Sequence, residues 1–219
     1  MIGKIALAAL LLASAAMLGG CLSRTDVEQS RRDLAVGKLA GNAAFGQSFV
    51  STHAYLSGID VMLAAYARVN TRDVVFHLRS DASSREDLVR MTFNAAGVAD
   101  NRFRRFDFEP LADSKGRSYF FFFTSPDSTP ENSITMWKAT EDVYAGGTAF
   151  KDGQPVDGDL VFKTYYRETI SLGRIASFVA RKFNGDRPFF IVYCSFLVLL
   201  LAATVKAWRG PHRRSKRNS

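Results

Sequence analysis

The chain has 219 residues, a formal net charge of +8 and only two cysteines. Cys21 and Cys194 alone provide neither a disulfide framework nor a thiolate zinc site, so the protein is held together by packing. From Leu22 to Ala180, nineteen Lys and Arg residues stand against twenty Asp and Glu residues, so the positive excess lies at the two ends of the chain. This distribution excludes a nucleic-acid-binding domain, which needs clustered cations.

Residues 1–21 have the composition of a bacterial export signal. Lys4 precedes an apolar stretch that ends in the small residues before Cys21. The stretch from Leu18 to Cys21 also resembles the lipobox of bacterial lipoproteins, in which lipid is attached to the cysteine. Three fates therefore remain open: cleavage as a signal peptide, retention as a signal anchor, or lipidation at Cys21.

Residues 22–43 are polar, and we interpret them as a linker, with a helix as one option. In residues 44–166, short runs of alternating apolar and polar residues are separated by turn residues, a pattern typical of β-strands. The runs are 45–51, 56–65, 74–79, 88–93, 103–110, 118–124, 134–138 and 158–166. The absence of an amphipathic helical pattern between them predicts an all-β fold, an antiparallel β-sandwich of the jelly-roll type.

Two details of that sandwich are predicted. Aromatic residues on both faces of the run 118–124 indicate a central strand that is covered on both sides. The glycine-rich stretch 144–153 indicates a long loop or a short hairpin.

The C-terminal part predicts attachment to a membrane. No charged residue falls between Phe189 and Val205, and a bilayer-spanning helix needs about 17 to 25 mostly apolar residues, so we expect a transmembrane helix at 188–208. The basic tail 209–219 is expected to remain cytoplasmic. Residues 167–187 carry an apolar stripe beside cations, which indicates either an interfacial helix or one packed on the sandwich. The predicted location is the bacterial inner membrane, with the sandwich in the periplasm.

Residues suited to catalysis are few. Ser48 or Ser51 with His53 is one conceivable nucleophile and base, but the Gly-x-Ser-x-Gly elbow is missing. His77 is expected to be solvated on the polar side of its strand. No cluster has the spacing of metal ligands or of a nucleotide-binding loop, so the sequence predicts no catalytic residue, no metal and no cofactor.

Three residues are candidates for ligand binding. Trp137 and Tyr144 lie close together along the chain, and jelly-roll modules use aromatic rings flanked by polar groups to bind glycans. Packing of Trp137 in the core is the alternative. Asp60 interrupts an apolar strand, where it either contacts a ligand or simply points outward.

Several core and turn motifs together resemble a β-sandwich module of bacterial membrane proteins. The motifs are Gln47–Phe49, Leu56–Asn70, Phe76–Leu78, Phe106–Pro110, Asp113–Phe120 and Gly158–Phe162. This module is commonly attached to, or encoded among, multi-spanning glycosyltransferases and other cell-envelope polysaccharide proteins. The resemblance implies a fold and a cellular context, and it supplies no catalytic residue.

We therefore expect a non-catalytic accessory module that is tethered to the lipid bilayer and contacts a glycan or a membrane glycosyltransferase. A first alternative is a structural or assembly subunit that recognises its partner through its transmembrane helix. A second alternative is a hydrolase of envelope glycans.

Overall fold

The computed structural model describes residues 22–168 and 187–209. Residues 22–168 form a β-sandwich, and residues 187–209 form helix α3 (Arg187–Arg209). The sandwich and the helix belong to separate units, so each is described by itself.

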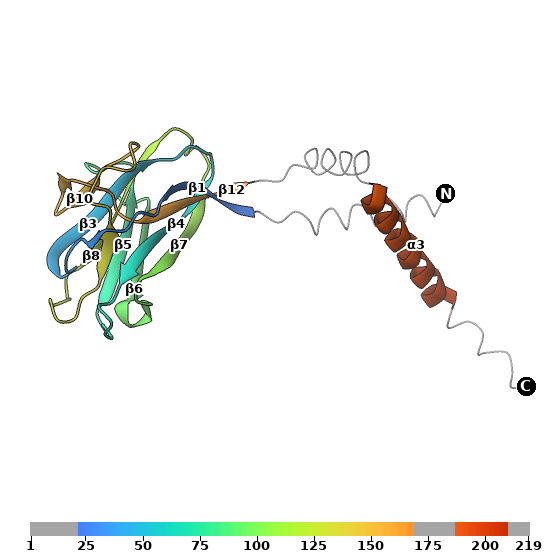
Figure 1. The fold of residues 1–219 in the computed structure, drawn as a ribbon, viewed down its shortest axis with the longest axis horizontal. Coiled ribbons are helices and arrows are strands. Elements are labelled where there is room, and N and C mark those ends of the chain that lie inside the picture. The colour runs from blue at the N-terminus through green and yellow to red at the C-terminus, as the bar shows by residue number, and fades with distance from the viewer. Residues whose placement is uncertain (1–21, 169–186, 210–219) are drawn as a thin grey trace, which may run out of the picture. The chain divides into compact units, whose positions relative to one another are not determined.

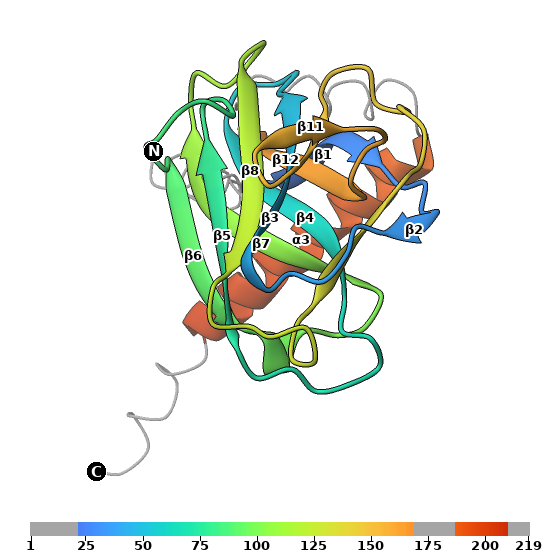
Figure 2. The ribbon, with the colours of Figure 1, turned by 90° about the vertical axis from the view of Figure 1, so that its left-hand side faces the viewer.

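Two antiparallel six-stranded sheets make up the sandwich (Figures 1 and 2). The first, here called the β4 sheet, has the order β1 (Leu22–Gln29), β12 (Phe162–Glu168), β4 (Leu56–Ala64), β9 (Thr135–Lys138) and β2 (Leu34–Ala35), and β7 (Arg102–Leu111) also pairs with β4. The second, the β8 sheet, has the order β11 (Gln154–Val156), β10 (Ala149–Lys151), β3 (Gly41–Val50), β8 (Ser118–Ser125), β5 (Asp73–Arg79) and β6 (Val89–Asn94). One 3₁₀ turn, Ala95–Gly97, joins β6 to β7.

Alternating side chains fill the space between the sheets. Ile59, Val61 and Leu63 of β4 are fully buried, and Phe121 and Phe123 of β8 face them from the other sheet. Each such side chain contributes about 1.5–3 kcal/mol by leaving water. The aromatic core therefore stabilises the sandwich without any covalent cross-link.

The predicted all-β sandwich is confirmed. The predicted runs from 45–51 to 134–138 correspond to strands β3 to β9, and β8 is central in its sheet, between β3 and β5. The last run starts later than expected, because β12 begins at Phe162. Residues 144–153 include a hairpin strand, and Asp152 and Gly153 take up positive φ angles of 53° and 77° at its turn, as Asp-Gly hairpins do.

The segment predicted as a linker, 22–43, is instead part of the sandwich. Strand β1 pairs with β12 along its length, and β2 pairs with β9. Gln29 is buried, and its side-chain amide donates to the carbonyl oxygens of Asp159 and Leu160. The many polar residues had indicated a linker, but an edge strand with one exposed face accommodates them. The sandwich therefore spans 22–168 rather than 44–166.

Both ends of the sandwich chain lie side by side. Leu22, the first residue of β1, pairs with Glu168, the last residue of β12 (Figure 1). The chain thus enters and leaves the domain at the same end.

Helix α3 covers the stretch 188–208, which the sequence predicted to be a transmembrane helix. Judged by length and apolarity, no helix among the described residues qualifies as a membrane span. The predicted export segment with Cys21, residues 169–186 of the juxtamembrane segment and residues 210–219 of the tail lie outside the described residues.

Candidate functional site

Two of the three candidate ligand-binding residues lie on the same outer face. Asp60 points outward from β4, between the inward-facing Ile59 and Val61. Trp137 points outward from β9, which pairs with the end of β4. The structure therefore places Asp60 and Trp137 on the solvent side of the β4 sheet.

Asp60 is the centre of a polar cluster with Arg105 and Tyr165 from the two neighbouring strands. The Tyr165 hydroxyl donates to Asp60 Oδ2 at 2.8 Å, and Arg105 Nη1 lies 3.5 Å from Asp60 Oδ1. The Arg105 guanidinium lies 3.4 Å from the centroid of the Tyr165 ring. Burial and the hydrogen bond to Asp60 raise the pKa of Tyr165 above its usual value.

Two further hydrogen bonds hold Arg105 in place, and a glycine leaves room for it. Its Nε donates to Asp107 at 2.8 Å, and its Nη2 donates to the Ser23 hydroxyl at 2.8 Å. Gly58 leaves room for the guanidinium, since a Cβ there would come within 2.8 Å of Arg105 Nε. Arg105 is thus held by side chains from three strands of its own sheet.

Trp137 is also held by a hydrogen bond and has a cation over its ring. Its indole nitrogen donates to Asn101 at 2.7 Å, and the Arg32 guanidinium lies 5.0 Å from its ring centroid. Arg32 also contacts the sulfur of Met62 at 3.7 Å.

Lys163 adds a third cation over a ring. Its amine lies 4.9 Å from the centroid of Phe103 and 2.8 Å from Glu28. Three aromatic rings on the β4 sheet are therefore each covered by a cation, an arrangement that contributes roughly 0.5–1 kcal/mol per pair at exposed sites. We call this surface the cation–aromatic face; it consists of Arg32, Asp60, Met62, Phe103, Arg105, Trp137, Lys163 and Tyr165.

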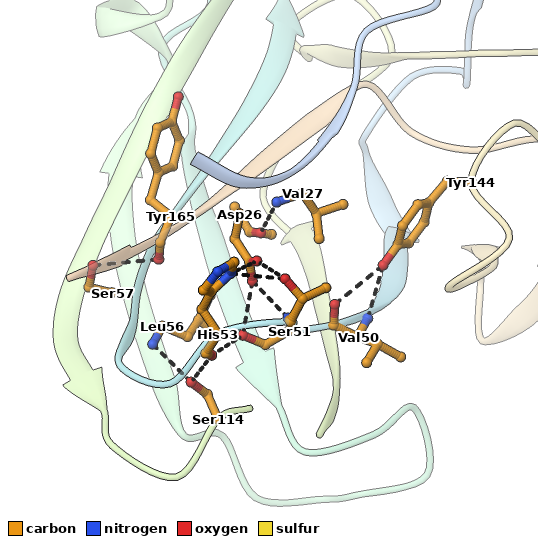
Figure 3. A network of polar contacts seen from close by, with 12 residues as sticks. Asp26, Val27, Val50, Ser51, His53, Leu56, Ser57, Ser114, Tyr144 and Tyr165 are labelled. Atoms are coloured by element: carbon orange, nitrogen blue, oxygen red, sulfur yellow. Dashed lines mark hydrogen bonds and ion pairs between the residues drawn. The ribbon is translucent and has the colours of Figure 1, made fainter. Parts of the chain in front are cut away.

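Tyr144 lies elsewhere and packs against the core. Its ring meets Phe162 edge-on at 5.5 Å. Its hydroxyl accepts from the backbone nitrogen of Val50 at 3.1 Å (Figure 3). Burial raises the pKa of Tyr144. Closeness along the chain therefore did not place Tyr144 beside Trp137.

A second polar cluster surrounds Asp26, whose side chain is completely buried (Figure 3). The register of β1 against β12 shifts between Thr25 and Glu28, and this bulge turns Asp26 toward the loop between β3 and β4. There Asp26 Oδ1 lies 2.6 Å from Nδ1 of His53, and Oδ2 accepts from the backbone nitrogen of Thr52 at 2.9 Å.

Hydrogen bonds determine the charge state of this carboxylate. Burial acts to raise the pKa of Asp26, but the hydrogen bonds from His53, Thr52 and Ser51 together lower it below its usual value. The His53 ring is fixed from its other side, because it stacks on Tyr166 at 4.1 Å. Asp26 therefore ties β1 to the β3–β4 loop as an ionised group.

Neither serine considered from the sequence pairs with the His53 ring. The Ser48 hydroxyl donates to the carbonyl oxygen of Thr148 at 3.3 Å. The Ser51 hydroxyl lies 3.1 Å from Asp26 Oδ2 and 2.8 Å from the carbonyl oxygen of His53, so it faces the carboxylate rather than the imidazole. A Ser-His-Asp triad needs the hydroxyl on the free ring nitrogen. The described residues also contain no group of three potential metal-ligating side chains.

His77 differs from its expected solvated position. It is only 8% exposed, its Nδ1 lies 2.7 Å from Asp87, and its ring stacks on Phe122 at 4.3 Å. Strand alternation correctly placed His77 on the outer side of its sheet. It could not reveal that neighbouring side chains cover that side.

Sequence reasoning missed Asp26 and Arg105. Asp26 lies in the segment interpreted as a linker, and only the adjacent Ser51 and His53 had been considered together. Arg105 lies 45 residues from Asp60, and strand register brings them together.

No protein-family model matches this chain, and a search of curated proteins found no significant match.

Proposed function

We propose that this chain is a non-catalytic accessory module of bacterial cell-envelope polysaccharide synthesis. In this proposal, the jelly-roll-like sandwich is tethered to the inner membrane, lies on its periplasmic side, and binds a multi-spanning glycosyltransferase through the cation–aromatic face. The resemblance of the core and turn motifs supports the cellular context.

The cation–aromatic face is the observation that carries the proposal. Arg, Trp, Tyr, Phe and Met are the residues enriched in protein–protein interfaces, and Arg, Trp and Tyr dominate their binding energy. Here they lie together on one sheet, and hydrogen bonds hold Arg105 and Trp137. A side chain already ordered in the free protein loses little further entropy on binding.

The cations favour a protein partner over a glycan. A sugar ring that stacks on Trp137 or Tyr165 would have to displace Arg32 or Arg105 from the ring face. Within the described part of the chain, Arg32 forms no ion pair with a carboxylate, so its guanidinium is free to bind a carboxylate of the partner, in the bidentate geometry that arginine favours.

The sequence supports the membrane tether. The uncharged run from Phe189 to Val205 lies within α3, and six cations follow in the last fourteen residues. Cations that flank a span favour the cytoplasmic side, which leaves the sandwich outside. We expect the chain to stay in the membrane fraction during carbonate extraction. In intact spheroplasts, we expect added protease to cleave the sandwich and leave the C-terminal tail uncut. Full release into the soluble fraction would contradict the tether.

Co-purification tests the partner. The tagged full chain, extracted in mild detergent from its own bacterium, is expected to retain a multi-spanning glycosyltransferase. Arg105→Glu should abolish this retention, while the exposed Arg85→Glu serves as a charge-matched control. Co-purification of polysaccharide without the glycosyltransferase would instead indicate that the module binds a glycan.

Replacement of α3 by an unrelated span separates the proposal from the assembly-subunit alternative. The proposal predicts that the partner still co-purifies after this replacement and no longer co-purifies with Arg105→Glu. If replacement of α3 abolishes retention of the partner and Arg105→Glu does not, the helix is the element that recognises the partner.

A further inference from the structure

We propose that one end of the sandwich rests on the headgroups of an anionic bilayer. This contact end consists of the β3–β4 loop (Ser51–Tyr55), the β7–β8 loop (Ala112–Arg117), the start of β1 (22–24) and the end of β12 (166–168). The inference rests on the membrane tether proposed above, and adds which surface of the domain the lipid contacts.

The two loops form one continuous surface with the end of β12. The backbone nitrogen of Gly116 donates to the Ser51 carbonyl at 2.7 Å, and the Ser114 hydroxyl donates to the His53 carbonyl at 2.9 Å. Arg167 donates its backbone nitrogen to the Tyr55 carbonyl at 2.9 Å. The contact end is therefore a shaped, hydrogen-bonded surface.

The path of the chain brings this end close to the membrane. Strand β1 begins at Leu22, immediately after Cys21. One residue spans at most about 3.6 Å, so lipid on Cys21, or a retained N-terminal anchor, leaves no linker between the bilayer and the strand. Because Leu22 pairs with Glu168, the chain also leaves toward the C-terminal segment from this end.

Exposed side chains at the contact end suit a headgroup layer. Tyr55 is 45% exposed and Leu22 is 49% exposed. Tyr55 also has a φ angle of +66°, a conformation that costs roughly 1–3 kcal/mol and holds an aromatic side chain at the surface. Tyrosine is one of the residues enriched at membrane–water interfaces.

The charges of the contact end favour anionic lipid. Its cations outnumber its carboxylates, and each cation near an anionic surface contributes about 1 kcal/mol. The ionised Asp26 carboxylate behind the loop adds one negative charge, which still leaves the cations in excess. The cations are Arg24, Lys115, Arg117 and Arg167, and the other carboxylates are Asp113 and Glu168, of which Glu168 pairs with Arg24.

Tyr66 provides a matched control at the opposite end of the same strand. It follows β4 as Tyr55 precedes it, with a φ of +56° and 39% exposure. Nine strand residues separate the two ends by about 30 Å. Arg68 covers the Tyr66 ring at 5.1 Å.

The test uses the full chain, processed by its own cell, with a fluorescent amino acid at position 55 or at position 66. Each variant is reconstituted into vesicles of phosphatidylethanolamine and phosphatidylglycerol that carry a headgroup spin label. We expect the label to quench most of the fluorescence at 55 and little at 66. Lys115→Glu with Arg117→Glu should relieve the quenching at 55.

Flotation of the same vesicles separates the two levels of the proposal. A chain that floats with the vesicles but shows equal or no quenching at 55 and 66 overturns the contact end and leaves the tether intact. A chain that does not float overturns both. Circular dichroism confirms that each variant retains its β-sheet signal.

Discussion

The two outer faces of the sandwich are both aromatic, but they are covered in different ways. On the β4 sheet, cations lie over the rings of Phe103, Trp137 and Tyr165. On the β8 sheet the rings pack chiefly on one another, since Phe120 stacks on Phe122 at 5.4 Å and meets Phe150 edge-on at 5.0 Å, although Arg79 also lies over the Phe122 ring at 4.5 Å. The first face offers charged groups that a partner can engage. On the second face, the cation over the ring, Arg79, is already paired with Asp87 at 2.7 Å.

A glycine makes the self-packed face possible. Gly46 lies beneath Phe120 and Phe122, and a Cβ there would approach the Phe121 carbonyl to 2.5 Å and the Phe120 ring to 2.7 Å. The β8 face therefore depends on close packing in addition to the contacts of Asp87 with His77 and Arg79, whereas the β4 face depends chiefly on polar contacts. Substitutions on the β8 face should chiefly lower stability, and those on the β4 face should chiefly affect binding.

The largest effect is expected for Gly46→Ala. The added methyl group meets backbone that cannot move aside, so we expect a loss of about 2–3 kcal/mol in the free energy of unfolding. Urea denaturation measures it. Gly97→Ala is the control, because a Cβ at Gly97 has only the end of Arg104 within reach, at 3.8 Å. Equal stability of the two variants would show that the β8 face is not tightly packed.

Asp87→Asn is expected to cost about 1–3 kcal/mol, because it removes the carboxylate shared by His77 and Arg79 at 2.7 Å each. Burial acts to raise the pKa of Asp87, but the hydrogen bonds from Arg79 and His77 lower it overall. A lowered carboxyl pKa stabilises the fold above the unfolded value of about 3.9, and this contribution is lost as the pH falls through the folded pKa.

The stability difference between wild type and Asp87→Asn should therefore be full at pH 7 and shrink below about pH 4. Unfolding at a series of pH values checks this. A difference that stays constant down to pH 2 would contradict a stabilising role for the ionised carboxylate.

Arg105→Ala should have a smaller effect on stability, below about 1 kcal/mol, because its ion pairs are partly open to solvent. Retention of the partner should nevertheless fall sharply. Arg105→Lys keeps the charge but not the fork of donors, and should restore only part of the retention. A stability loss as large as that of Gly46→Ala would place Arg105 among structural residues.

The smallest stability effect is expected for Arg32→Ala, at about 0.5 kcal/mol or less. It removes the cation over Trp137 and exposes the indole ring. Thermal unfolding should barely change. If glycan binding appears in this variant, the cation is what keeps sugars from the ring in the native protein.

Local patterns predicted most of the strands, because alternation records which side chains leave water. Phe121 and Phe123 could be assigned to a central strand for this reason. Strand β1 could not be recognised, because an edge strand buries few side chains, here those of Asp26, Val27 and Gln29.

The candidate sites depend on register between distant strands, which the sequence does not show. Asp60 and Trp137 were recognised as unusual in their local context, yet their partners Arg105 and Arg32 carry no local signal. Asp26 meets His53 through a bulge in β1. A shift of one residue in either strand would point these side chains to the other face.

Site-specific photo-crosslinking in living cells tests the central claim most directly. A photoreactive amino acid replaces Met62, on the cation–aromatic face, or Phe150, on the outer face of the β8 sheet. We predict a crosslink from position 62 to a multi-spanning glycosyltransferase, lost with Arg105→Glu, and none from position 150. Equal crosslinking from both positions, or crosslinking from position 62 that is unaffected by Arg105→Glu, would contradict recognition through the cation–aromatic face.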